Sequence, residues 1–154
     1  MSGRYLLTGA TGFVGANVVR HLLARGDEVV CVLRKPNLCV EGIPVTLSTA
    51  SMTDADALAK AAEGCDGVFH VAGTFDPGPE GEALMRTIHV DATKALIAAC
   101  KLAGVPRLVL CSSSITVGFG PKEAPGDEDS PIDPDRVYGR SGALRTYYLS
   151  LIHI

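Results

Sequence analysis

The chain has 154 residues, of which 47% are hydrophobic and 20% are charged, and its formal net charge is −3. This length predicts a single domain, and the apolar fraction argues against intrinsic disorder. The slight acidic excess argues against nucleic-acid binding, which depends on basic residues that neutralise phosphates. The longest uncharged stretches, 5–19 and 108–121, are interrupted by Gly and Ser. Neither therefore has the roughly 20 apolar residues of a membrane helix, and we expect no membrane partner.

The N-terminus and the cysteines indicate the compartment. A strand pattern begins directly after Ser2-Gly3, so we expect no signal peptide. Five scattered cysteines, an odd number without a C-x-x-C pair, indicate reduced thiols rather than a disulfide framework or a zinc site. We therefore expect a cytoplasmic protein without a metal site.

Short apolar runs alternate with helical patterns along the chain. The predicted strands are 4–8, 28–33, 44–47, 67–72 and 107–112. The predicted helices are 13–25, 54–63, 80–103 and 136–149, and a loop rich in Pro, Gly and acidic residues covers 121–134. Alternation with connections of this length predicts parallel βαβ units with right-handed crossovers. The fold class is therefore α/β, a three-layer, doubly wound parallel sheet (Rossmann fold) with strand order 3-2-1-4-5.

A glycine-rich loop lies between the first predicted strand and the first predicted helix. Gly9, Gly12 and Gly15 follow the spacing G-x-x-G-x-x-G. The first glycine permits a tight turn, the second lets a pyrophosphate approach the backbone, and the third lets the helix pack closely on the strand. The N-terminus of the helix then offers amide donors to an anion. This placement predicts dinucleotide binding.

Five motifs in order resemble a known family: T-G-A-T-G-F-V-G at 8–15, V-C-V-L-R at 30–34, H-V-A-G at 70–73, S-S-S-I-T-V-G at 112–118 and Y-G-R-S at 138–141. They are similar to the extended short-chain dehydrogenase/reductases, the NAD-dependent epimerase/dehydratase family, in its dihydroflavonol-reductase-like or sugar-epimerase-like branches. The resemblance covers essentially 1–146, whereas family members are longer and carry a C-terminal substrate-binding part. It implies a truncated NAD(P)-binding Rossmann domain over 1–148.

The resemblance also implies the residues that hold the cofactor. They are Gly9, Thr11, Gly12, Phe13, Val14, Gly15, Arg34, Val71, Ala72, Gly73 and Tyr138. NAD-preferring sheets place an acidic residue at the end of the second strand, on the ribose hydroxyls, but this chain has Arg34 there. An arginine suits a 2′-phosphate, so NADP is preferred over NAD, although an ordinary charged strand end remains the alternative. Ser51 stands near the position at which the family has an adenine-binding acid.

The resemblance further implies two catalytic residues. Ser114, or Ser113 if the register slips by one, would hydrogen-bond the substrate oxygen that gains or loses a hydride. Tyr138 would be the general acid/base on the same oxygen. The family pattern is Y-x-x-x-K, but Gly142 replaces the lysine that lowers the pKa of the tyrosine, and Arg140 lies about 200° away around a continuous helix. His89 replaces a frequent Asn, and we interpret it as a core histidine with a satisfied hydrogen bond.

The resemblance implies an oxidoreductase or epimerase/dehydratase acting on a carbonyl or hydroxyl of a small molecule or nucleotide-sugar. The missing lysine favours an alternative, a non-catalytic NAD(P)-binding or redox-sensing module, and a gene fragment without function is a third. The last six residues, 149–154, match the translation of a transposase adapter end, so we expect a non-native tail. The unpartnered edge of the fifth strand predicts aggregation or a homodimer.

Overall fold

The computed structural model describes residues 2–35 and 40–152. The chain forms two compact units. The first consists of 1–73 and 91–111, and the second of 74–90 and 112–154. The first unit contains the whole sheet, and the second contains short helical segments and connecting loops.

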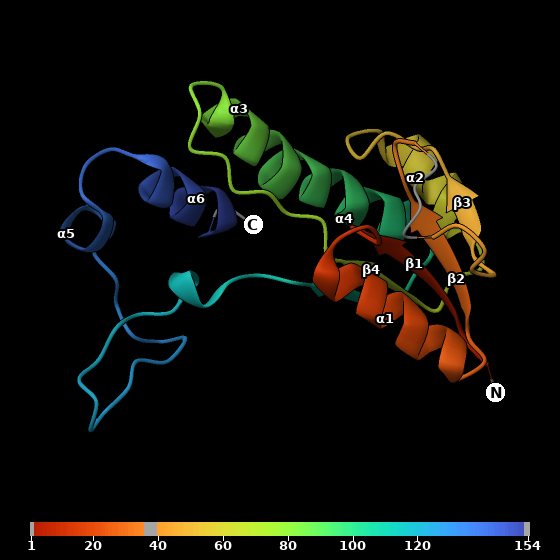
Figure 1. Ribbon diagram of the computed structural model, residues 1–154, viewed down its shortest axis with the longest axis horizontal. Coiled ribbons are helices and arrows are strands. Elements are labelled where there is room, and N and C mark those ends of the chain that lie inside the picture. The colour runs from red at the N-terminus through yellow and green to blue at the C-terminus, as the bar shows by residue number, and fades with distance from the viewer. Residues whose placement is uncertain (1, 36–39, 153–154) are drawn as a thin grey trace. The chain divides into compact units, whose positions relative to one another are not determined.

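The sheet of the first unit has five parallel strands (Figure 1). The strands are β1 (Arg4–Thr8), β2 (Glu28–Val32), β3 (Thr46–Ser48), β4 (Gly67–His70) and β5 (Leu108–Leu110). Their order is β3-β2-β1-β4-β5, which confirms the predicted topology. In this register Thr8 lies beside both Val32 and His70. The carboxyl ends of the three central strands therefore meet at one edge, where doubly wound folds bind ligands.

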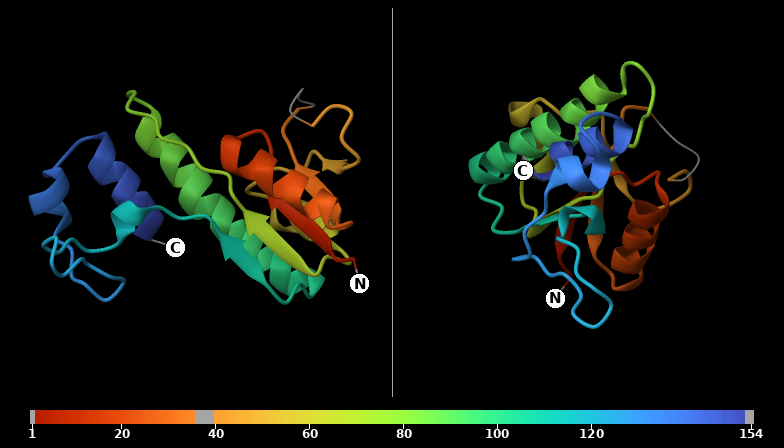
Figure 2. Two further views of the ribbon diagram at one scale, coloured as in Figure 1. Left: turned by 60° about the horizontal axis from the view of Figure 1, so that its bottom comes forward. Right: turned by 90° about the vertical axis from the view of Figure 1, so that its left-hand side faces the viewer.

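Helices cover both faces of the sheet (Figures 1 and 2). The helices of this unit are α1 (Phe13–Ala24), α2 (Ala55–Ala62) and α4 (Ala92–Ala103). Leu7 belongs to an apolar cluster with residues of α1, whereas its neighbour Leu6 belongs to the cluster with α2 and α4. Successive strand residues point to opposite faces, so a continuous apolar run fills both clusters.

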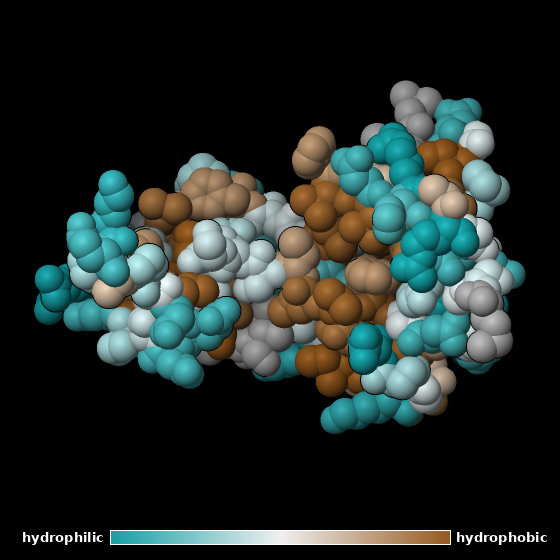
Figure 3. Space-filling view, turned by 90° about the horizontal axis from the view of Figure 1, so that it is seen from below, coloured by the Kyte–Doolittle hydropathy of each residue, from teal (hydrophilic) through white to brown (hydrophobic). Residues whose placement is uncertain are grey.

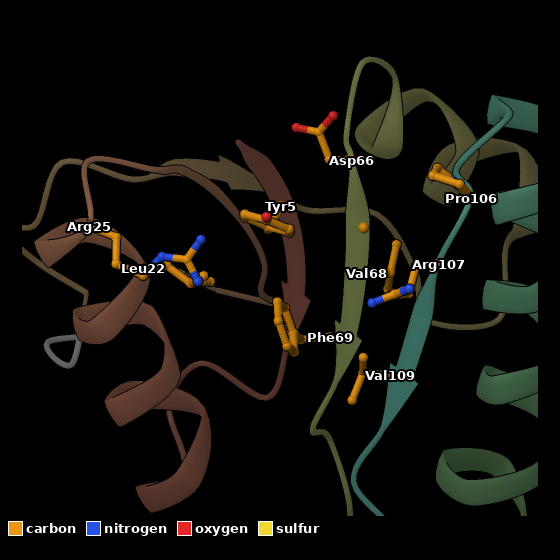
Figure 4. Close-up of a pocket in the computed structure, with 10 residues that line it drawn as sticks. Tyr5, Leu22, Arg25, Asp66, Val68, Phe69, Pro106, Arg107 and Val109 are labelled. Atoms are coloured by element: carbon orange, nitrogen blue, oxygen red, sulfur yellow. The ribbon is translucent and has the colours of Figure 1, made fainter. Parts of the chain in front are cut away.

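The α1 side of the sheet is incompletely covered near β5. Val109, in the middle of this edge strand, is 45% exposed. Figure 3 shows apolar side chains gathered on the surface of this unit. An open hollow on the α1 side is lined by Tyr5, Phe69 and Val109, with Arg25, Asp66 and Arg107 also present (Figure 4). Parallel sheets normally have both faces covered, so this surface is unusually open.

The second unit consists of short segments. They are α3 (Gly81–Met85), the π-helical η1 (Arg86–Asp91, in this unit up to Val90), the 3₁₀ turn η2 (Ser114–Thr116), α5 (Pro134–Tyr138) and α6 (Ala143–Ile152). The helix predicted over 80–103 is present over 81–103, and residues 86–91 within it are π-helical rather than α-helical. The prediction of one helix over 136–149 is wrong, because Gly139 (φ +75°) and Gly142 (φ +109°) leave the helical region.

Within 2–35 and 40–152 no helix is both long and apolar enough to cross a bilayer. The same residues contain no group of three or more His, Cys, Asp or Glu placed to hold a metal ion.

Candidate functional site

The glycine-rich loop turns at the carboxyl end of β1, and two of its glycines leave no room for a side chain. A Cβ on Gly9, whose φ is +78°, would lie 2.6 Å from the Ala72 nitrogen. A Cβ on Gly15 would lie 2.1 Å from the carbonyl oxygen of Gly9. Real Cβ atoms essentially never come this close, so the chain must have glycine at both positions. The loop thus brings α1 and the segment after β4 against the end of β1.

The N-terminus of α1 is open to an anion. Gly12 caps the helix with an extended backbone, and its N–H donates to the Gly9 carbonyl at 3.0 Å. No side chain of the described residues accepts a hydrogen bond as a cap here, and the first turn contains no acidic residue. Phe13 is 87% exposed beside these amides. Free amide donors at the positive end of a helix dipole are a suitable binding site for a phosphate.

The segment after β4 lies beside the loop, as the resemblance implies. The Val71 N–H donates to the Thr8 carbonyl at 3.2 Å, and the Ala72 N–H donates to the Thr8 hydroxyl at 3.3 Å. Val71 and Ala72 are half-buried, and Gly73 is exposed. Residues 9–15 and 71–73 therefore border one surface at the carboxyl edge of the sheet.

Arg34 is exposed two residues after the end of β2, at the same carboxyl edge. The preceding residue is fixed because the Leu33 N–H donates to the Ser48 carbonyl of β3 at 2.9 Å. Ser51 is exposed and its hydroxyl lies 3.2 Å from that of Thr53. A guanidinium here can pair with a phosphate, and the Ser51 hydroxyl can form hydrogen bonds but carries no charge.

Ser114 and Tyr138 both belong to the second unit. Ser114 is exposed and begins the η2 turn, whereas Ser113 caps that turn and is half-buried. The Tyr138 hydroxyl donates to the carbonyl oxygen of Ile115 at 3.0 Å, and the ring lies 5.3 Å from that of Tyr148. The structure thus brings Tyr138 to the backbone next to Ser114.

The environment of Tyr138 disfavours its ionised form. Burial, and then the neighbouring Tyr148, raise the pKa of Tyr138. Gly142 supplies no charge, and Arg145 is paired with Asp135 at 2.8 Å. Arg140 is exposed in the irregular segment between α5 and α6, so its predicted position on a continuous helix is wrong. At neutral pH Tyr138 is therefore protonated, so its hydroxyl can donate a hydrogen bond but cannot act as a base.

His89 is a buried histidine, as expected from the sequence, and its hydrogen bonds determine its tautomer. The Thr74 N–H donates to Nε2 at 3.1 Å, and Nδ1 lies 2.7 Å from the Ser150 hydroxyl. Because Ser150 in turn donates to the Tyr147 carbonyl at 2.8 Å, Nδ1 carries the proton. Burial lowers the pKa of His89, so the ring is held neutral. Ser150, within the segment 149–154, is 6% exposed.

Sequence reasoning missed a polar cluster beneath the loop. Thr8, His70 and Thr93 are each at most 1% exposed. The His70 ring is hydrogen-bonded to the Thr8 hydroxyl at 2.7 Å through Nδ1, and to the Thr93 hydroxyl at 2.9 Å through Nε2. The sequence offered one indication of this cluster, because His70 is a polar residue at the end of an otherwise apolar strand. The hollow of Figure 4 is a different place, because Tyr5, Asp66 and Arg107 lie at the amino ends of the strands.

Comparison with known proteins gives the family. The sequence model of the NAD dependent epimerase/dehydratase family matches residues 5–150, and the chain belongs to this family. It is 35% identical over 151 residues to UDP-glucose 4-epimerase of Streptomyces lividans, covering 92% of this chain and 45% of that protein. It is 36% identical over 148 residues to dihydroflavonol 4-reductase of Zea mays, covering 86% and 41%. The chain thus spans less than half the length of these relatives.

A solved structure supports the same assignment. A short-chain dehydrogenase/reductase superfamily protein from Agrobacterium tumefaciens, determined with bound NAD, has a TM-score of 0.76 and 28% identity. The match covers 97% of this chain and 42% of the other. The fold and the family are therefore those that the five motifs imply.

Proposed function

We propose that the first unit binds an NAD(P) dinucleotide at the carboxyl edge of its sheet, with the pyrophosphate on residues 9–15. The observation that carries this proposal is the pair of glycines whose Cβ atoms would collide with the Ala72 nitrogen and the Gly9 carbonyl. Because these two residues have no side chains, the loop can turn tightly, and the backbone amides at the N-terminus of α1 stay open to a phosphate. Thr11, Phe13 and Val14 complete the loop, and the segment 71–73 borders the more distant parts of the cofactor.

We propose NADP as the preferred form because of Arg34. Its guanidinium can form charge-assisted hydrogen bonds with a 2′-phosphate, which NAD lacks. No acidic residue stands at this position to accept the ribose hydroxyls of NAD. The structure of the relative from Agrobacterium tumefaciens contains NAD. The proposed preference for NADP therefore depends on Arg34 alone.

We propose that the complete protein is an oxidoreductase or an epimerase/dehydratase that acts on a carbonyl or hydroxyl group of a small molecule. Both similar relatives named above are enzymes of this kind, and one of them is named for a nucleotide-sugar. The cofactor would supply or accept the hydride. Ser114 would hold the substrate oxygen, and Tyr138 would give it a proton or take one. The bond from Tyr138 to Ile115 must first break.

A second candidate is a non-catalytic dinucleotide-binding or redox-sensing module. The observation that favours it is the state of Tyr138, whose pKa is raised and whose hydroxyl is bonded to a backbone carbonyl. Residue 142 is a glycine, so no lysine at this position lowers the pKa of Tyr138. Such a module would still bind the dinucleotide through the loop and Arg34, but it would not catalyse a reaction.

Fluorescence titration with NADPH and NADH tests the proposal. We expect saturable binding, tighter for NADPH, and Arg34→Ala should weaken NADPH alone by about tenfold, the loss of one charge-assisted hydrogen bond. Arg140→Ala, which removes an exposed arginine of the second unit, is the matched control. Failure of both nucleotides with a folded sample would disprove binding. Tighter binding of NADH would disprove the role of Arg34.

A further inference from the structure

We propose that Thr8, His70 and Thr93 form a positioning relay that holds the glycine-rich loop and the segment 71–73 in one fixed geometry for the dinucleotide. This inference rests on the proposed function. None of the three side chains belongs to the loop or to 71–73, so they are positioning residues.

The relay connects three elements at one point. Thr8 is the last residue of β1, His70 is the last residue of β4, and Thr93 is the second residue of α4. Both nitrogens of the His70 ring are hydrogen-bonded to hydroxyls, at 2.7 Å to Thr8 and 2.9 Å to Thr93. A ring held at both ends cannot rotate without losing a hydrogen bond in a site that water does not reach.

The Thr8 hydroxyl passes this constraint to the cofactor surface. It accepts the Ala72 N–H at 3.3 Å, while the Thr8 carbonyl accepts the Val71 N–H at 3.2 Å. The next residue along the chain is Gly9, which leaves no space for a Cβ against Ala72. The turn of the loop and the start of 71–73 are therefore fixed to each other by the side chain and the backbone of one residue.

The surroundings make a merely stabilising role a poor explanation. Leu7 precedes Thr8 in β1, Leu96 lies one helical turn after Thr93 in α4, and both are at most 1% exposed. Apolar side chains of similar shape would fill such a place without the cost of burying hydroxyls and an imidazole. A fully satisfied polar cluster in an aliphatic core instead specifies one arrangement of the elements that it joins.

The test compares near-isosteric pairs. Thr8→Val and Thr93→Val remove one hydroxyl each, whereas Thr8→Ser and Thr93→Ser keep it. We expect each valine variant to raise the Kd for NADH by about tenfold, the effect of one hydrogen bond, and each serine variant to remain near the wild type. Val105→Ala is the control, because Val105 is buried next to β5, away from the relay. It should lower the Tm and leave the Kd unchanged.

Amide hydrogen exchange of the cofactor-free protein gives a second readout. We expect Thr8→Val and Thr93→Val to accelerate exchange at Ala72 and Gly12 by about tenfold, and Val105→Ala to leave these two amides no more affected than the rest of the unit. If the wild type binds neither NADH nor NADPH, the proposed function fails, and exchange alone decides the relay. Unchanged exchange at Ala72 and Gly12 in both valine variants would overturn the relay, as would an unchanged Kd for NADH in both variants when the wild type binds NADH.

Discussion

The hydroxyl of Tyr138 donates a hydrogen bond to the backbone carbonyl of Ile115, the residue that follows Ser114. This bond holds the proposed acid/base residue in its protonated form, because only a protonated hydroxyl can donate. Burial and Tyr148 act in the same direction and raise the pKa of Tyr138. An ordinary tyrosine is ionised in only about one molecule in a thousand at pH 7, and Tyr138 is ionised less often still.

The first prediction is that Tyr138 titrates above the usual tyrosine range and that a lysine at 142 lowers its pKa. Ultraviolet titration of the chain and of Tyr138→Phe isolates the contribution of this residue. We expect Gly142→Lys to lower the pKa of Tyr138, because a nearby cation favours the phenolate. The φ of Gly142 is +109°, so the lysine also favours a continuous helix over 139–142, which circular dichroism would detect. A pKa below 10 in the unmodified chain would contradict this account.

The second prediction concerns the two glycines that form the loop. Gly15→Ala and Gly9→Ala should abolish dinucleotide binding, because a Cβ at either position collides with backbone atoms and must displace the loop. Gly26→Ala is a matched control. Gly26 has a positive φ of +83°, like Gly9, but nothing lies within 4 Å of its Cβ position. It should cost about 1 kcal/mol of stability and leave binding intact. Equal binding by all three variants would show that the loop does not hold the cofactor.

The third prediction is a pH dependence that originates at His89. Burial lowers its pKa in the folded protein, so the unfolded chain binds more protons. Stability from this group is therefore complete above the unfolded pKa of about 6.5 and is lost as the pH falls below that value. Urea denaturation at pH 7.5 and pH 5.5 should show a smaller free energy of unfolding at the lower pH. His89→Asn should reduce the difference, and His21→Asn, at an exposed position, should not. If the free energy of unfolding of His89→Asn differs between the two pH values as much as that of the unmodified chain, another group causes the pH dependence.

The fourth prediction concerns self-association of the isolated chain. The edge strand β5 has Val109 45% exposed, and the neighbouring sheet face is open. An unpaired parallel edge with apolar side chains favours pairing with a second copy. Light scattering should show dimers or larger species, and Val109→Lys should shift them toward monomer. Leu102→Lys, at a position 64% exposed on α4, is the control and should have little effect. A monodisperse monomer of the unmodified chain at high concentration would contradict the prediction.

Local sequence determined the sheet and the glycine-rich loop. Apolar runs such as 4–8 and 28–33 predict buried parallel strands because burial on both faces requires continuous apolar residues. Gly9 and Gly15 predict the loop because steric exclusion depends on the residue type itself, and the structure shows the close contacts. Five motifs in one order were specific enough to identify the family, which the match over 5–150 confirms.

Only the tertiary structure showed what joins these parts. The helical pattern over 136–149 is continuous in the sequence, yet positive φ angles at Gly139 and Gly142 divide it, and glycine is compatible with either conformation. The partner of Tyr138 is a backbone carbonyl, which no side-chain pattern can indicate. Thr8, His70 and Thr93 are up to 85 positions apart in the numbering and meet only when β1, β4 and α4 pack together. A hydrogen bond depends on a distance of about 3 Å and on its direction, and packing alone sets both.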